Sequence, residues 1–197
     1  MDAQKEFVRL SRKYKTPKQV QNFLRKFPYN REEKKETQRS AYAAFKYGKA
    51  HCLEAAFIAA AILEHHGYPP LVVSFESQDS LGHVIYAFKQ NGKWGSIGKS
   101  RDNGLHGREP IFRSIRDLVW SYYAEYIDNT GKITEYKLAN LDDTKTDWRY
   151  SKKNVWKAEK YLAGMKHIPL KSSEKTYQRL FRRFKKYGHP KPEKYWW

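Results

Sequence analysis

The sequence predicts an α+β fold in which an alanine-rich helix packs on an antiparallel sheet. The segment 51–67, HCLEAAFIAAAILEHHG, combines strong helix formers with apolar residues on most faces and ends at a glycine, which is typical of a buried helix. Three apolar runs follow at 71–77, 83–89 and 93–97, and an Asn-Gly hairpin signal joins the last two. A helix followed by consecutive antiparallel strands indicates a helix layer packed on one sheet.

Short amphipathic helices are expected before the alanine-rich one. Residues 2–14 carry apolar side chains at helical spacing. Thr16 followed by Pro17 is a helix start signal, and Pro28 ends the helix that it begins. Residues 29–39 are highly charged and read as a loop or an exposed helical turn.

On the C-terminal side of the sheet, apolar spacing predicts a helix over 113–126, a strand over 133–138 and another helix over 154–162. A chain of 197 residues is long enough for one domain with a core. We therefore expect one domain over residues 1–160, N-terminal helices included, and a basic, aromatic extension over 161–197 that is helical and docked.

The positive charge lies at the two ends of the chain. Residues 1–50 hold 14 Lys and Arg against 5 Asp and Glu, residues 51–150 hold 11 against 13, and residues 151–197 hold 14 against 3. The basic flanks indicate either contacts with nucleic acid or another polyanion, or helix faces that simply point to water. In the extension, basic residues alternate with aromatic ones, which suits phosphate contact and base stacking but equally suits a docked amphipathic helix.

Composition excludes several classes of protein. A single cysteine, Cys52, leaves no internal disulfide and no multi-cysteine zinc site. The histidines show no paired metal-ligand spacing, and no phosphate-binding glycine motif is present, so we expect no cofactor and no metal. No apolar run is long enough to span a bilayer and the N-terminal residues lack an apolar signal core, which predicts a cytoplasmic protein.

Cys52 is the candidate nucleophile. It stands at the first turn of the alanine-rich helix, where backbone N–H groups lack acceptors and the helix dipole is positive. Both features favour the thiolate, which is the nucleophilic form, and the same N–H groups suit an oxyanion. The alternative is a small buried hydrophobic residue.

A nucleophilic cysteine needs a base, and the base needs a group that orients it. His83 begins a strand 31 residues after Cys52, and Asp102 follows the next strand, 19 residues after His83. An imidazole and a carboxylate on neighbouring strands fit these two roles. Each residue alone also fits a strand start or an ordinary turn.

This order of residues resembles the transglutaminase-like superfamily, relatives of the papain-like cysteine enzymes. The matching segments are GKAHCLEAAFIAAAILEHHGYPP around Cys52, SLGHVIYAF around His83 and WGSIGKSRDNGLHGR around Asp102. Residues 16–160 are also similar to a group of bacterial transglutaminase-like proteins that share segments of the form AHCLEAA, HGYPPL and SRD-x-GLHGR.

The resemblance implies a papain-like core with a Cys52–His83–Asp102 triad. Such a site attacks a protein or peptide amide and forms a thioester, which makes the chain a hydrolase, deamidase or acyltransferase.

Glu76 and Asp79 are alternative groups to orient the imidazole, and His106 is a further candidate for the site. A Cys–His dyad is also open. The competing hypothesis is an inactive transglutaminase-like fold that binds nucleic acid or an acidic protein through its basic flanks.

Overall fold

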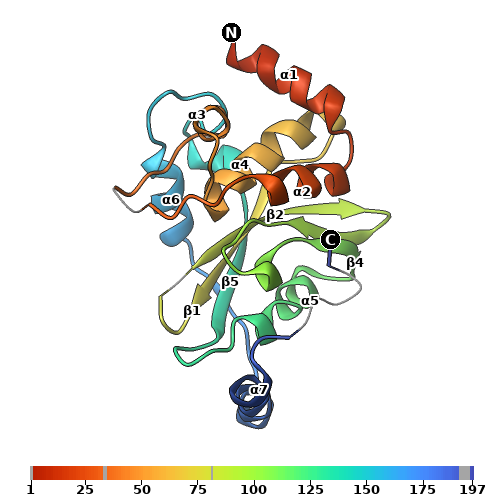
Figure 1. Ribbon diagram of the computed structural model, residues 1–197, viewed down its shortest axis with the longest axis vertical. Helices are drawn as coiled ribbons and strands as arrows, with labels where there is room; N and C mark the ends of the chain where they lie inside the picture. Colours follow the sequence, from red (N-terminus) through yellow and green to blue (C-terminus); the bar gives the residue numbers. More distant parts are fainter. Residues whose placement is uncertain (1, 33–34, 81, 191–195) are drawn as a thin grey trace.

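The computed structural model describes residues 2–32, 35–80, 82–190 and 196–197 (Figure 1). The α-helices within these ranges are α1 Ala3–Lys13, α2 Pro17–Lys26, α3 Ala41–Tyr47, α4 Cys52–Leu63, α5 Ile115–Trp120, α6 Trp156–Ala163 and α7 Glu174–Tyr187. The strands are β1 Leu71–Ser77, β2 His83–Gln90, β3 Lys93–Ile97, β4 Arg108–Phe112, β5 Ile133–Asn140 and β6 Ile168–Pro169.

The strands form one sheet in the order β4-β3-β2-β1-β5-β6, and every neighbouring pair is antiparallel. The predicted Asn-Gly hairpin joins β2 to β3. Asn91 and Gly92 both have positive φ, 50° and 74°, as the favoured two-residue hairpin turn requires. The α+β class expected from the sequence is confirmed.

Both faces of the sheet are covered. Val84, Tyr86 and Phe88 of β2 pack into a core with α1–α4, whereas Ile85 and Ala87 face the opposite way, into a core with α5 and α7. Figure 1 shows α2 and α4 on one side of the sheet and α5 and α7 on the other. This alternation is the period of two that a strand buried on both faces displays.

Helix α4 is buried along its whole length after its first residue. All residues from Leu53 to Leu63 are buried, and a 3-10 turn carries the chain to Gly67, whose φ of 77° ends the helix in the left-handed region. Because α4 is fixed on all sides, the position of Cys52 at its N-terminal end is fixed too.

The expected helices before α4 are confirmed, and so is the start signal of α2. Thr16 accepts from the backbone N–H of Gln19, and Gln19 reaches back to the Thr16 N–H, with Pro17 in the first turn.

The helix predicted over 113–126 is wrong in its second half. α5 ends at Trp120, and a 3-10 turn follows at Tyr123–Glu125. Tyr122 is fully buried and its hydroxyl donates to the carbonyl of His106, which draws the chain out of the helical path. The sequence pattern also missed β4 and β6.

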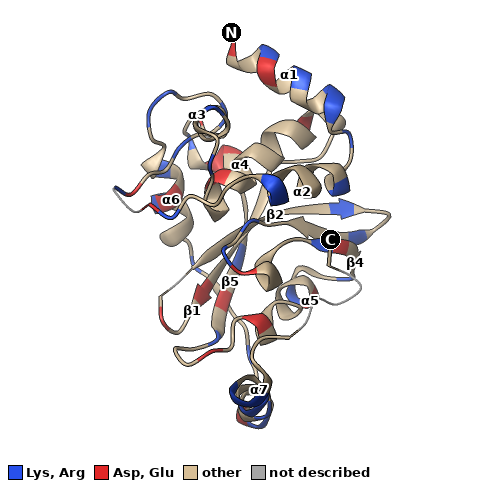
Figure 2. Cartoon of the chain, viewed as in Figure 1, with Lys and Arg blue, Asp and Glu red and all other residues tan. Residues whose placement is uncertain are grey.

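The helix expected in the extension is α7. Its side chains Tyr177, Leu180, Phe181 and Phe184 pack on the core beside α5, whereas its lysines and arginines are exposed. Figure 2 marks these basic positions in blue along α7. The proposed boundary at residue 160 stays a prediction. In the described part of the chain, no helix has both the length and the apolarity that crossing a membrane requires.

Candidate active site

A pocket of about 390 Å³ lies where the N-terminal end of α4 meets the start of β2. Cys52, His51 and His83 line it together with the loop that precedes α3 and with residues of α6. The structure therefore brings the candidate nucleophile and the candidate base to one pocket. Cys52 is partly exposed, while only 4% of His83 is exposed.

Two imidazoles, those of His51 and His83, line the pocket with Cys52 and act on its thiol. Burial alone would raise the pKa of this thiol, but hydrogen bonds to His51 and His83 and the positive charges of the two rings hold it well below its ordinary value. Burial likewise opposes the charged form of His51, but its hydrogen bond to Cys52 and the negative charges of Cys52, Glu54 and Glu32 raise its pKa to about 9. The site thus favours a thiolate beside an imidazolium at neutral pH.

The ring of His83 is fixed by a backbone carbonyl. Its Nε2 lies 3.0 Å from the carbonyl oxygen of Leu105, and because a carbonyl only accepts, Nε2 carries the proton. The other ring nitrogen, Nδ1, is then the one available to the sulfur of Cys52. This is the tautomer that a general base for Cys52 needs.

The structure does not bring Asp102 to His83. Asp102 is exposed at the start of a 3-10 turn, where its backbone N–H donates to Ser100 Oγ. Among the described residues it has no hydrogen bond or ion pair to an imidazole. Leu105, three residues later, supplies the acceptor that the sequence led us to expect from Asp102.

Residues 98–108, which we call the carbonyl loop, are held in place by hydrogen bonds from two buried side chains. The amide of Gln21 is fully buried; it donates to the carbonyl of Gly98 and accepts from the N–H groups of Gly98 and Gly107. Arg108, also fully buried, donates to the carbonyls of Gly104 and His106 at 2.7 and 3.0 Å. These bonds hold the loop that presents the Leu105 carbonyl.

Rings enclose Arg108 on two sides. Its guanidinium lies 3.9 Å from the ring centroid of Tyr122 and 4.3 Å from that of Trp196. The C-terminal residues therefore cover the back of the carbonyl loop.

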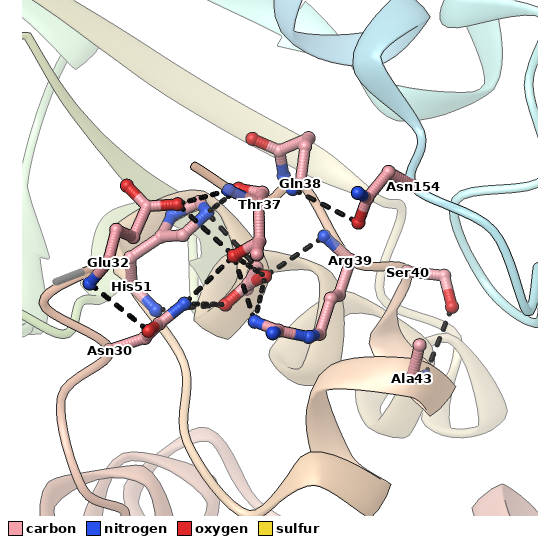
Figure 3. Close-up of polar contacts among 10 residues, drawn as sticks. Asn30, Glu32, Thr37, Gln38, Arg39, Ser40, Ala43, His51 and Asn154 are labelled. Carbon is pink, nitrogen blue, oxygen red and sulfur yellow. Dashed lines mark hydrogen bonds and ion pairs between the residues drawn. The ribbon is translucent and has the colours of Figure 1, made fainter. Parts of the chain in front are cut away.

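On the opposite side, a buried carboxylate organises the loop that walls the pocket (Figure 3). Glu54 is fully buried and accepts hydrogen bonds from the backbone N–H groups of His51 and Arg39 and from the side chains of Thr37, Asn30 and Arg39. We call residues 29–32 and 35–39, together with His51 and Glu54, the charged wall. The same wall holds His51, whose Nε2 lies 3.0 Å from the carbonyl of Thr37.

Two tyrosines lie near the sulfur. Burial first, and then the negative charge of Cys52, raise the pKa of Tyr29 and of Tyr126. Both hydroxyls are thus kept protonated, and Tyr29 lines the pocket, where its hydroxyl is a potential donor to a ligand.

The other candidates from the sequence do not bond to Cys52 in the part of the chain that the structure describes, although Glu76 lines the same pocket. His106 is buried and its Nε2 donates to the carbonyl of Ser100. Asp79 accepts from the hydroxyls of Ser77 and Thr130, and Glu76 lies 3.4 Å from His167. Among the bonds of the described residues, none of these three contacts Cys52.

Sequence reasoning missed three residues of the candidate site: His51, Glu54 and Leu105. The glutamate three residues after a helix N-cap position is a known capping signal, so Glu54 was detectable. Leu105 contributes only its backbone, which no residue type signals. In the described residues, no group of three or more His, Cys, Asp or Glu side chains is arranged to hold a metal ion.

The fold and this site define a transglutaminase-like protein of the cysteine-protease type. The family model for vasohibin matches residues 47–185, most of the chain, so the chain belongs to the vasohibin family. The transglutaminase-like superfamily indicated by the sequence motifs is thereby confirmed.

The other comparisons add little. Among solved structures, that of Legionella pneumophila LapG (EGTA-treated) matches with 12% identity and a TM-score of 0.40, over 84% of this chain and 99% of that one. A likeness at this level does not bear on the chemistry of the site. No curated protein sequence gave a significant match.

Proposed function

We propose that the chain is a cysteine hydrolase or acyltransferase that acts on a protein or peptide amide through a thioester on Cys52. The main support is the pair of imidazoles, His51 and His83, that line one pocket with Cys52 at the start of a buried helix and lower the pKa of its thiol. A cysteine that only fills space needs neither a cation nor a base beside it.

In the first half of the reaction, the Cys52 thiolate attacks the carbonyl carbon of the amide. A C–S bond forms and the carbonyl π electrons move to oxygen, which gives an oxyanion that the N–H groups of the first turn of α4 can bind. His83 Nδ1, which takes the thiol proton of Cys52 as the thiolate forms, passes that proton to the amide nitrogen as the C–N bond breaks. The amine leaves and the thioester remains.

In the second half, the acceptor attacks the thioester carbon while giving a proton to His83 Nδ1. The C–S bond then breaks and the thiolate returns, with the Leu105 carbonyl still holding the other ring nitrogen. Water as acceptor gives hydrolysis of a peptide bond or deamidation of a side-chain amide, and an amine gives acyl transfer.

Acylation by 4-nitrophenyl acetate tests this proposal without a known substrate. We expect a burst of nitrophenolate and an acetyl group on Cys52, seen by intact-protein mass. The burst is lost in Cys52→Ala and strongly slowed in His83→Ala, while Ser74→Ala, a hydroxyl in the same pocket, serves as the matched control. A wild-type chain that is not acetylated at Cys52, or an equal burst in Cys52→Ala, contradicts the proposal.

A second candidate function, nucleic-acid binding, is supported by α7. Its basic side chains are all exposed on one helix, and its only acidic residue, Glu174, bonds to Gln178. These basic residues are Lys175, Arg179, Arg182, Arg183, Lys185 and Lys186. Tyr177, Phe181 and Phe184 of α7 are docked and Tyr187 is exposed, so the helix offers contact with phosphates and a single exposed ring.

Binding of a double-stranded oligonucleotide at increasing salt concentrations tests this second function. We expect affinity to fall steeply with salt and to weaken in the variant Arg179→Gln/Arg182→Gln/Lys186→Gln. The control replaces three lysines outside α7, Lys5, Lys18 and Lys26. Equal losses in the two variants would leave only a general effect of net charge.

A further inference from the structure

The pocket in front of Cys52 has a charge opposite to that of the chain. Lys and Arg account for 39 residues and Asp and Glu for 21. Among the described residues, however, four glutamates and no lysine or arginine line the pocket. These glutamates are Glu32, Glu36, Glu76 and Glu159. A cleft lined by carboxylates attracts positively charged ligands, even on a protein whose net charge is positive.

Three of the four pocket glutamates lie outside the sheet. Glu32 and Glu36 come from the loop before α3, and Glu159 comes from α6. Burial raises the pKa of Glu159; the His51 cation opposes this, and the negative charges of Glu32, Glu36 and Cys52 add to it.

These carboxylates differ from the one that is structural. Glu54 is fully buried, and its oxygens accept from five groups of the chain. Glu36 and Glu159 are exposed and have no hydrogen bond or ion pair to any residue that the structure describes. Glu32 uses one oxygen, which accepts from Thr37. Among the described residues, His51 is therefore the cation of the pocket lining that acts on two of these three carboxylates, and no lysine or arginine pairs with Glu36 or Glu159.

An unpartnered amide group in the same pocket also indicates a ligand. Gln38 lines the pocket and is only 2% exposed. Its Nε2 has no hydrogen-bond partner within the described residues. A buried amide donor without an acceptor is costly, and a carbonyl oxygen of a bound peptide would satisfy it.

We propose that the pocket recognises a polypeptide substrate by a lysine or arginine side chain near the scissile amide. The carboxylates of Glu32, Glu36 and Glu159 bind that cation, and Gln38 donates to a backbone carbonyl of the same peptide. This inference rests on the proposed function and names the class of substrate for that site.

Charge-selective labelling of Cys52 tests the inference without turnover. The probes are two methanethiosulfonates, one carrying a 2-(trimethylammonium)ethyl group and one a 2-sulfonatoethyl group, used with EDTA present. In both, the thiolate attacks the sulfenyl sulfur, a disulfide forms and methanesulfinate leaves. With rates divided by those for a small free thiol, we expect the cationic probe to label Cys52 about tenfold or more faster than the anionic one.

A matched pair of variants isolates the three carboxylates. In Glu32→Gln/Glu36→Gln/Glu159→Gln the ratio of cationic to anionic rates should fall to near one. The control Glu109→Gln/Asp117→Asn/Glu174→Gln removes the same charge away from the pocket lining and should keep the wild-type ratio. An equal ratio in the wild type, or an equal fall in both variants, overturns the inference.

Protection by blocked tripeptides separates a peptide from a bare cation. We expect Ala-Lys-Ala to slow labelling of wild-type Cys52 by iodoacetamide, Ala-Glu-Ala to have less effect, and Gln38→Leu to weaken the protection. Protection by Ala-Glu-Ala equal to that by Ala-Lys-Ala contradicts the inference. If Cys52 reacts with none of these reagents, the proposed function itself fails, which is a distinguishable result.

Discussion

The charged wall and the carbonyl loop, which lie on the two sides of the Cys52–His83 pair, shift the pKa of a histidine in opposite directions. In the charged wall, the pKa of His51 is raised to about 9, because bonding to Cys52 and the nearby carboxylates outweigh burial. In the carbonyl loop, the pKa of His106 is lowered to about 4 by burial, with the charges of Lys99 and Arg25 adding to the effect although its bond to Ser100 opposes it.

The difference assigns a separate task to each region. The charged wall supplies ionic partners, and we infer that it sets the protonation of the sulfur. The carbonyl loop is held by the neutral amide of Gln21 and by backbone carbonyls, and we infer that it sets the orientation of His83. A variant in the wall should therefore change pH profiles, and a variant behind the loop should change rates at every pH.

The largest expected effect is that of Glu54→Gln. The substitution removes a buried charge that accepts from Arg39, Thr37 and Asn30, and we expect it to lower the free energy of unfolding in urea by about 2–4 kcal/mol. The control is Glu64→Gln, which breaks a partly exposed pair with Arg149 and should cost about 1 kcal/mol or less. Equal losses of stability in the two variants would contradict the claim that the buried Glu54 carboxylate holds the charged wall together.

Gln21→Leu tests the carbonyl loop. It leaves three buried backbone groups of Gly98 and Gly107 without a partner, which should lower stability by about 2–3 kcal/mol. We also expect alkylation of Cys52 to slow at every pH with its midpoint unchanged. A shifted midpoint would show that the loop, too, controls protonation.

The two histidines predict opposite pH dependences of stability. The raised pKa of His51 stabilises the fold fully below its unfolded value of about 6.5, and this contribution is lost as pH rises through about 9. The lowered pKa of His106 means that the folded state binds fewer protons, so stability falls as pH drops from about 6.5 to about 4.

Urea unfolding between pH 4 and pH 9.5 measures both effects. Relative to the wild type, His51→Gln should flatten the alkaline loss and His106→Asn the acidic loss. If both variants act in the same window, the contrast between the regions is wrong.

The smallest effect is expected for Asp102→Asn. The side chain is exposed and contacts neither imidazole among the described residues, so stability should change by less than about 0.5 kcal/mol and Cys52 reactivity by less than about twofold. A loss of reactivity as large as that of His83→Ala would restore the triad with Asp102.

Local patterns in the sequence predicted much of this architecture. The alanine-rich run predicted α4, the Asn-Gly pair predicted the β2–β3 hairpin, and the approach to the helix placed Cys52 at its first turn. These signals are short in range, because caps and turns depend on a few neighbouring residues.

The rest depends on contacts between distant segments. Nothing in the residue type of Leu105 marks its carbonyl as the partner of His83, since every residue has one. In the sequence, His51 looks only like the residue that precedes a helix. The contacts with Glu54 and with the loop before α3 that make it part of the site appear only in the structure. Likewise, α5 stops early because Tyr122 bonds to a loop that is distant in sequence.

The pH dependence of Cys52 alkylation by iodoacetamide, in the wild type and in His83→Ala, tests the central claim most directly. The structure predicts an apparent thiol pKa well below the ordinary value of about 8.5 and slower alkylation at neutral pH once His83 is removed. A thiol that titrates at its ordinary value, or one that the His83→Ala substitution leaves unchanged, would contradict an activated Cys52–His83 pair.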